Sequence, residues 1–127
     1  MIFRYLIIRS MSVYGGHPID RHKCKADGNN VHLPMPRSAA ENQWYKNYAA
    51  KVNIPSFWLG INDVDIEGEW RTDNGDLQAY FNWHPNQPNN YGKEDYIHFN
   101  GDGRWGDHSE NGRYYVLCTY VLAGTEP

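Results

Sequence analysis

The sequence predicts an α+β fold in which, after one strand at the start, helices come before a series of short antiparallel strands. Helix signals end before Pro55, and the rest of the chain consists of short aromatic runs separated by Asn, Asp and Gly. This order suits helices packed against antiparallel sheet and not a parallel βαβ repeat. A third observation is the stretch NWHPNQPNNYGKEDY at 82–96, which is too polar for a core strand and too rich in proline for a helix. It is expected to be a long surface loop.

The first expected element is a strand near the start of the chain. IFRYLIIR at 2–9 is rich in Ile, Phe and Tyr, as strands are. Arg4 and Arg9 interrupt this run too closely for the apolar centre of a signal peptide. No apolar run approaches the roughly 20 residues that a membrane-spanning helix needs, so membrane insertion is not expected.

Two helices are expected next. The segment 17–28 begins with His-Pro and ends at Gly, which marks a short first helix. The second helix begins at Ser38, where Glu41 three residues later completes a capping-box pattern. Its apolar residues recur every four positions and predict a stripe that packs on the core: Trp44, Tyr48 and Val52.

The two cysteines lie near opposite ends of the chain. Cys24 falls in the expected first helix, and Cys118 in the apolar run YYVLCTYVL. A disulfide between them would close a loop near 100 residues and contribute roughly 4 to 5 kcal/mol in the chain-entropy model. We favour this disulfide, and hence an oxidising, extracellular setting. The alternatives are two buried free thiols, or a zinc site at His22 and Cys24, which lacks two further ligands at a known spacing.

Short aromatic strands are expected in the second half of the chain. The candidates are FWLGI at 57–61, the patch at 68–71, AYFNW at 79–83, DYIHF at 95–99 and YYVLCTYV at 114–121. Polar loops separate them, including NGDGRWGD at 100–107. No repeat or linker divides the chain, so one domain over 1–127 is expected.

Charge and motifs narrow the function. Twelve basic against fifteen acidic residues give a formal charge of -3 with no basic run. A basic patch for nucleic acid or an anionic membrane is therefore disfavoured. Nothing marks a nucleophile elbow, a zinc protease helix or a phosphate loop, so an enzyme is not expected.

Side-chain oxygens gather in or beside the expected loops. Hard cations such as calcium take six to eight oxygen ligands from carboxylates, amide carbonyls and water. Taken singly, such residues are usually solvated turn formers, but their concentration in loops that can converge indicates a calcium site. No EF-hand loop is present. The candidate ligands are Asp63, Glu67, Gln87, Asn89, Asn90, Glu94, Asp95 and Asp107.

These segments carry a resemblance to a known family. FWLGINDVDIEGEW, then NWHPNQPNN, GKEDY, NGDGRWGD and YYVLC follow one another as in a C-type lectin domain. The resemblance is strong over 57–118 and moderate over 24–52, through CKADGNNVHLPMPRSAAENQW. It implies the C-type lectin-like fold, with two helices, a small sheet joining the termini, and an upper sheet that bears the long calcium-binding loop.

The resemblance also implies a function for that loop. In the family, a Glu-Pro-Asn or Gln-Pro-Asp triplet binds calcium through side-chain oxygens, and two sugar hydroxyls complete the ion's coordination. Gln87, Pro88 and Asn89 stand at that position, with a cis peptide bond expected before the proline. The remaining positions for the same ion fall on Glu94, Gly106 and Asp107.

Two departures from the family pattern affect this ion. Gly106 stands where the Trp-Asn-Asp motif has its asparagine, so one side-chain ligand is missing. Gln87 replaces a carboxylate of the mannose-type triplet, which leaves Glu94 and Asp107 as the charged ligands. Fewer charges should weaken calcium affinity towards the roughly 10⁻⁴ to 10⁻³ M of extracellular modules.

Sugar preference follows from the two amides. Gln87 and Asn89 each use their carbonyl on the metal and offer only N–H donors to a sugar. By resemblance, the leading glutamine indicates galactose and the closing asparagine indicates mannose, so galactose-type or broad galactose and mannose specificity is expected. Tyr91 or Trp83 would stack on an apolar sugar face, although a core position is at least as well supported for Trp83.

A second family calcium position lies beside the first. Four carboxylates and one amide would surround this ion, and they would repel one another without it, so it is expected to be structural. The family's second disulfide is missing, because its cysteine positions fall on Tyr96 and Glu110. The residues for this second ion are Asp63, Glu67, Asn90, Glu94 and Asp95.

These expectations describe a secreted, extracellular, calcium-dependent lectin whose partners are glycans or glycoproteins. Gly106 favours an alternative, a module for protein or mineral-matrix interaction that keeps only structural calcium. The family often gains avidity by clustering weak sites, which leaves a homo-oligomer open. No heptad or collagen-like repeat is present to drive it.

Overall fold

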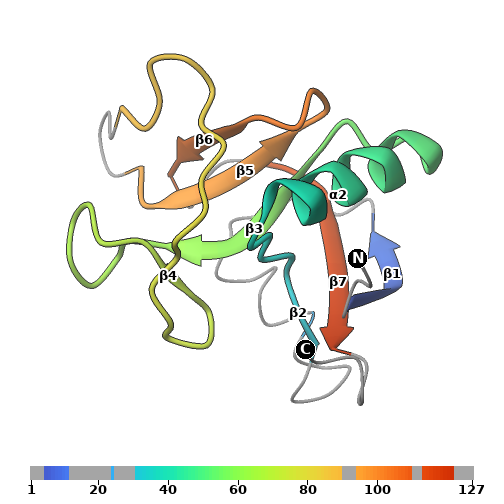
Figure 1. Cartoon of the computed structure of the whole chain (residues 1–127), viewed down its shortest axis with the longest axis horizontal. Helices are drawn as coiled ribbons and strands as arrows, with labels where there is room; N and C mark the ends of the chain where they lie inside the picture. The colour runs from blue at the N-terminus through green and yellow to red at the C-terminus, as the bar shows by residue number, and fades with distance from the viewer. Residues whose placement is uncertain (1–4, 12–23, 25–30, 90–93, 110–112, 122–127) are drawn as a thin grey trace.

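The computed structural model describes residues 5–11, 24, 31–89, 94–109 and 113–121. The fold is α+β, with one helix and two small antiparallel sheets in this part of the chain (Figure 1). The elements are β1 (Tyr5–Met11), β2 (Val31–His32), α2 (Ala39–Lys51), β3 (Ser56–Asn62), β4 (Arg71–Thr72), β5 (Tyr96–Asn100), β6 (Trp105–His108) and β7 (Val116–Val121). Of the first expected helix, only Cys24 lies within the described residues, and it is helical.

One sheet joins the beginning of the chain to its end. Its strand order is β1-β7-β2, and β1 runs antiparallel to β7 from the pair Tyr5 and Val121 to the pair Met11 and Val116. Figure 1 shows β1 beside β7, far from β4 and the long loop. The expected first strand is therefore confirmed over its described residues.

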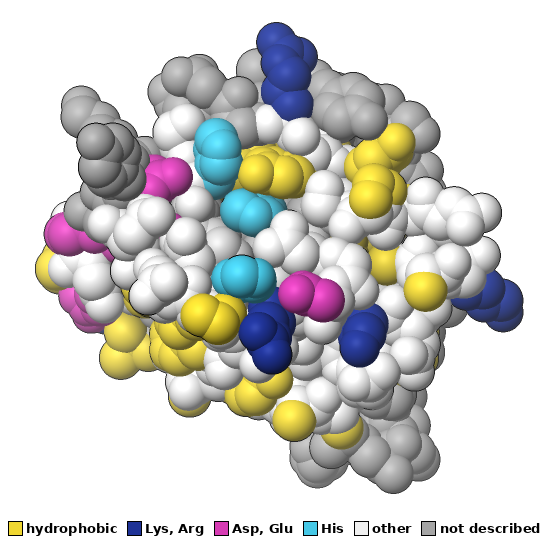
Figure 2. All heavy atoms as spheres, turned by 90° about the horizontal axis from the view of Figure 1, so that it is seen from above, with side chains coloured by type: hydrophobic (Ala, Val, Ile, Leu, Met, Phe, Trp, Pro, Cys, Tyr) yellow, Lys and Arg dark blue, Asp and Glu magenta, His cyan; other side chains and the backbone are white. Residues whose placement is uncertain are grey.

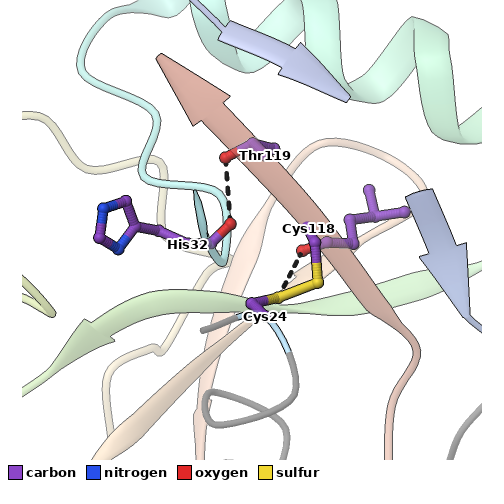
Figure 3. The surroundings of a disulfide bond; sticks show 5 residues. Cys24, His32, Cys118 and Thr119 are labelled. Carbon is purple, nitrogen blue, oxygen red and sulfur yellow. Dashed lines mark hydrogen bonds between the residues drawn. A yellow bond between two sulfur atoms is a disulfide. The ribbon is translucent and has the colours of Figure 1, made fainter. Parts of the chain in front are cut away.

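The disulfide fixes this sheet to the segment before it. Cys24 and Cys118 are bonded, with their Cα atoms 5.3 Å apart, and both are fully buried. Beside them, the Thr119 hydroxyl donates to the His32 carbonyl at 3.1 Å and ties β7 to β2 (Figure 3). The expected disulfide is confirmed, and it leaves the Cys24 sulfur unavailable to the alternative zinc site.

The second sheet has the order β4-β3-β5-β6 and carries the main core. Residues 57–61 of β3 are all buried, as a short continuous apolar run predicts. Because side chains alternate along a strand, Phe57 packs with Phe99 and Tyr45 in one cluster, while Trp58 joins the cluster around the disulfide. The central strand thus holds the two cores together.

Helix α2 begins as its sequence predicts. The Ser38 hydroxyl accepts the N–H of Glu41 at 3.1 Å, and the Glu41 carboxylate accepts the N–H of Arg37 at 3.1 Å. The helix ends at Lys51, and Asn53 follows in the left-handed region with φ of 61°.

The expected apolar stripe of this helix is confirmed in part, because Trp44 and Tyr48 pack against the core while Val52 does not. Tyr45 and Ala49 form the buried face, whereas Trp44 and Tyr48 are partly buried and stack on each other. Val52 is 37% exposed at the end of the helix. The buried face includes a polar residue, Asn42, which hydrophobic spacing does not reveal.

Several strand expectations also need correction. AYFNW is not a strand, since only Trp83 forms an isolated bridge, with Trp105, and the aromatic rings of this segment pack against the core instead. Strand β6 was expected to be part of a polar loop. The patch at 68–71 contributes only Arg71 to the short strand β4, and β2 was not foreseen. Within the described residues, no helix has the length and apolar character to cross a membrane.

Candidate functional site

Three carboxylates converge where two central strands end. Asp63 follows β3, Glu67 lies in the turn after it, and Asp95 directly precedes β5. The N–H of Asp63 donates to the Asp95 carbonyl at 3.1 Å, which brings the two strand ends together. Each of the three residues offers a carboxylate oxygen, and these oxygens lie within 4.8 Å of one another. The family resemblance implies these three, together with Asn90 and Glu94, as ligands of one ion.

Asp63 is held in surroundings that oppose its charge. The residue is 2% exposed, and burial is the main cause that raises the pKa of its carboxyl to about 7. The N–H of Gly68, which donates to Oδ2 at 2.9 Å, acts in the opposite direction, and the neighbouring Glu67 and Asp95 raise the pKa further. The other oxygen, Oδ1, is buried and receives no hydrogen bond from the described residues. A buried acceptor without a donor, beside two more carboxylates, fits a hard cation.

The long loop is attached to β6 through main-chain hydrogen bonds. The N–H of His84 donates to the Trp105 carbonyl at 2.8 Å, and the N–H of Trp105 donates to the Asn82 carbonyl at 2.8 Å. A turn then closes where the N–H of Gln87 donates to the His84 carbonyl at 2.9 Å. The peptide bond between Gln87 and Pro88 is cis, as expected.

The main chain of the triplet region contacts β6. The N–H of Asn89 donates to the Asp107 carboxylate at 3.1 Å, and Asp107 is only 3% exposed. The side-chain carbonyl oxygen of Gln87 is buried and has no hydrogen-bond partner among the described residues. An unpartnered amide oxygen close in sequence to a buried carboxylate contact is what a calcium ligand set would leave without its ion.

The remaining expected site residues are distributed as follows. Glu94 is half-buried next to Asp95, while Asn90 and Tyr91 lie outside the described residues. Trp83 packs between other aromatic rings, with its centroid 5.3 Å from Trp70 and 6.1 Å from Trp105. Its half-buried ring therefore belongs to the edge of the core.

Sequence reasoning missed His98. A Cβ atom on Gly106 would lie 2.8 Å from Cε1 of His98, so the imidazole fills the space that a side chain at 106 would need. The ring stacks on Tyr114 with centroids 4.3 Å apart and lies 6.0 Å from the ring of His108. Burial, and then the neighbouring His108, lower the pKa of His98 to about 4. Gly106 was the one signal in the sequence, because a glycine in place of a larger residue leaves room for a neighbouring side chain.

The family of the chain follows from comparison with known proteins. The family model described as Lectin C-type domain matches residues 20–120, and the chain therefore belongs to the C-type lectin domain family. Collectin-10 of Homo sapiens is 35% identical over 91 residues, which cover 70% of this chain and 33% of collectin-10. The matched region is thus about a third of that relative's length.

Solved structures show the same fold. The C-type lectin CEL-I from Cucumaria echinata matches with a TM-score of 0.83 and 24% identity, covering 96% of this chain and 94% of CEL-I. The herring type II antifreeze protein matches with a TM-score of 0.81 and 18% identity, covering 96% of this chain and 94% of that protein. The C-type lectin-like fold predicted from sequence is confirmed.

Proposed function

We propose that this chain is a calcium-dependent carbohydrate-binding domain that recognises terminal sugars with galactose-type or broad galactose and mannose specificity. The observation that carries the proposal is the buried, unpartnered side-chain oxygen of Gln87 in the triplet loop. The contact between Asn89 and Asp107 adds a carboxylate to the same region. The family of the chain and its likeness to the lectin CEL-I support the same reading.

Two ions are proposed. Calcium at the triplet would take two vicinal sugar hydroxyls into its coordination shell, which is the chemistry that the ion supplies. The amide N–H groups of Gln87 and Asn89 would donate to those hydroxyls. The residues proposed to hold this ion are Gln87, Asn89, Glu94 and Asp107, with Tyr91 beside the sugar.

The second ion would be structural. The unpartnered oxygen of Asp63, the nearby carboxylates and the raised pKa of Asp63 all favour a cation there. Neutralising this cluster would hold the end of β3 against the start of β5. The residues proposed for this ion are Asp63, Glu67, Asn90, Glu94 and Asp95.

The setting proposed for this function is extracellular, as a secreted protein. A buried disulfide that joins the two ends of the fold suits an oxidising compartment. The proposed partners are glycans or glycoproteins, and the proposed role is binding without catalysis.

The test is binding to immobilised galactose and mannose in calcium, with competition by each free sugar. We expect Gln87→Ala and Asn89→Ala to lower binding by at least about tenfold, since each removes a metal ligand. Asn74→Ala is the matched control, because Asn74 is an exposed asparagine in another turn. Equal binding by all three variants and the parent protein would reject the triplet as the sugar site.

A second function deserves the same experiment. The chain would be a module for protein or mineral-matrix interaction with only structural calcium. Gly106 favours this, because it offers no ligand and His98 occupies the neighbouring space. The fold shared with an antifreeze protein also supports it. A folded protein whose stability responds to calcium but which binds neither sugar would favour this second function.

A further inference from the structure

His98 and His108 stand on one face of two paired strands. In the β5 and β6 pair, His98 lies opposite Gly106, and Tyr96 lies opposite His108. Residues directly opposite one another share a face, and so do residues two apart on one strand. The two histidines are therefore diagonal neighbours, with ring centroids 6.0 Å apart and planes inclined by 69°. Figure 2 shows histidine side chains close together on one face of the molecule.

Gly106 gives these rings access to each other. A Cβ atom at this position would lie 2.8 Å from Cε1 and 3.0 Å from Nε2 of His98. The Cε1 and Nε2 edge of the imidazole therefore faces β6, the strand that carries His108. Tyr114 supports both rings, since it stacks on His98 at 4.3 Å and meets His108 edge-on at 5.6 Å.

In its neutral form, each ring can offer the lone pair of one nitrogen to a metal. Nδ1 of His108 lies 3.2 Å from the Ser109 carbonyl and 3.5 Å from the Ser109 hydroxyl; because the carbonyl can only accept, the shorter contact favours the tautomer with a proton on Nδ1. That tautomer leaves the lone pair on Nε2, the arrangement typical of metal-binding histidines. Nδ1 of His98 is buried and has no hydrogen-bond partner among the described residues. The lowered pKa of His98 keeps its ring neutral near pH 7, the form that binds metals.

We propose that His98 and His108 form a binding site for a transition-metal dication such as Zn²⁺ or Cu²⁺. Imidazole nitrogen suits these borderline metals, whereas calcium prefers oxygen ligands. Two protein ligands leave the other coordination positions to water, so the affinity is modest. The site goes beyond the proposed lectin function and does not depend on it.

The experiment is calorimetric titration of the calcium-saturated protein with Zn²⁺ and, separately, with Cu²⁺. His98→Phe keeps a ring on Tyr114 but removes both nitrogens, and His108→Phe does the same on β6. We expect each variant to weaken the binding by at least about tenfold, the order of loss known for groups that support a metal site. His84→Phe is the matched control, an exposed histidine whose loss should leave the affinity unchanged.

A second measurement uses the unaltered protein and so does not depend on how the variants fold. Substoichiometric Cu²⁺ should broaden the NMR signals of the His98 and His108 rings before that of His84. The proposal is overturned if folded His98→Phe and His108→Phe proteins bind as the parent does. It is also overturned if binding follows His84 instead, or if the two rings are not the first to broaden.

Discussion

At the residue scale, Gly106 and His98 are linked. Where the family has an asparagine side chain at position 106, this chain has a glycine, and the ring of His98 fills the space. Gly106 is buried in β6, and the imidazole lies where a side chain at position 106 would otherwise be. Sequence comparison with the family predicted a lost ligand at this position. It did not predict a compensating ring, because the pairing of β5 with β6 brings together residues eight apart that no short motif connects.

Gly106→Ala should therefore destabilise the protein by about 1 to 3 kcal/mol, the usual cost of overpacking. The added Cβ would lie 2.8 Å from the His98 ring, which is held by Tyr114. In a double-mutant cycle with His98→Ala, measured by urea unfolding, most of that cost should disappear. Strictly additive costs would show that the two residues are not in steric contact.

His98 also predicts a pH dependence for the metal-free protein. Its pKa falls from an ordinary 6.5 to about 4 on folding, so between these values the unfolded chain binds more protons and stability rises with pH. The contribution is present above about pH 6.5 and is lost as pH falls towards 4, by at most about 3 kcal/mol. Asp63, whose pKa is raised, acts with the opposite sign in the same range.

The difference between parent and His98→Phe isolates this contribution. Urea unfolding at several pH values from 4.5 to 7.5 should show a smaller acid loss for His98→Phe than for the parent. Parallel pH curves for the two proteins would mean that His98 titrates in the fold as it does in the unfolded chain.

At the scale of the elements, α2 and β6 position the triplet loop through one buried amide. Asn42 donates to the Gly103 carbonyl at 2.8 Å and accepts the indole N–H of Trp105 at 2.8 Å. Trp105 in turn holds both ends of the segment 82–84 by main-chain bonds. A polar residue on the helix thus orients the strand that supports the loop.

Asn42→Ala should cost about 1 to 3 kcal/mol, because it leaves the Trp105 N–H buried without a partner. Asn47→Ala on the same helix is the control, since Asn47 is exposed and bonds only to exposed Gln43 among the contacts described. Thermal and urea unfolding of both variants provide the comparison. A similar small effect in both would contradict the role assigned to Asn42.

The same elements show where sequence reasoning works. Ser38 and Glu41 predicted the helix start, and the run FWLGI predicted β3, because both signals are local. The segment 79–83 was mistaken for a strand, because aromatic residues there serve ring packing and not pairing. Strand β6 was missed, because its Gly and Asp resemble turn residues and its pairing with β5 is set by tertiary contacts.

The candidate site also contains parts that the sequence predicts and parts that only the fold reveals. The acids and amides were identified as candidate ligands from their concentration in the loops and were assigned to two ions by the family resemblance. The structure brings Asp63, Glu67 and Asp95 within reach of one ion. The unpartnered oxygen of Gln87 and the ring over Gly106 depend on packing between distant segments. Residue spacing within one segment cannot predict these contacts between distant segments.

At the scale of the whole molecule, one disulfide and the proposed calcium share the task of closing the fold. The disulfide joins Cys24 to Cys118 in β7, a strand of the β1-β7-β2 sheet. At the other sheet, the family's second disulfide position falls on Tyr96, next to Asp95 of the acidic cluster. The loops there would therefore depend on packing and on the proposed ion.

Calcium should therefore raise the melting temperature, with a gain in stability of roughly 2.7 kcal/mol at a hundred times its dissociation constant. Removing it should cost this domain more thermal stability than it costs a two-disulfide relative. Asp63→Asn should abolish most of the calcium response while making the calcium-free protein more stable, because it removes a buried charge. Asp65→Asn is the control, an exposed neighbour outside the cluster. A melting temperature that chelator leaves unchanged in the parent would contradict this.

We propose above all that the triplet loop binds sugar through calcium. The most direct test is binding of the folded protein to a glycan array in millimolar calcium, repeated on the same preparation with excess chelator. We expect binding that disappears with chelator and that free galactose, or both galactose and mannose, competes away. Glycan binding that persists in chelator, or no glycan binding by a protein shown to be folded and calcium-loaded, would contradict it.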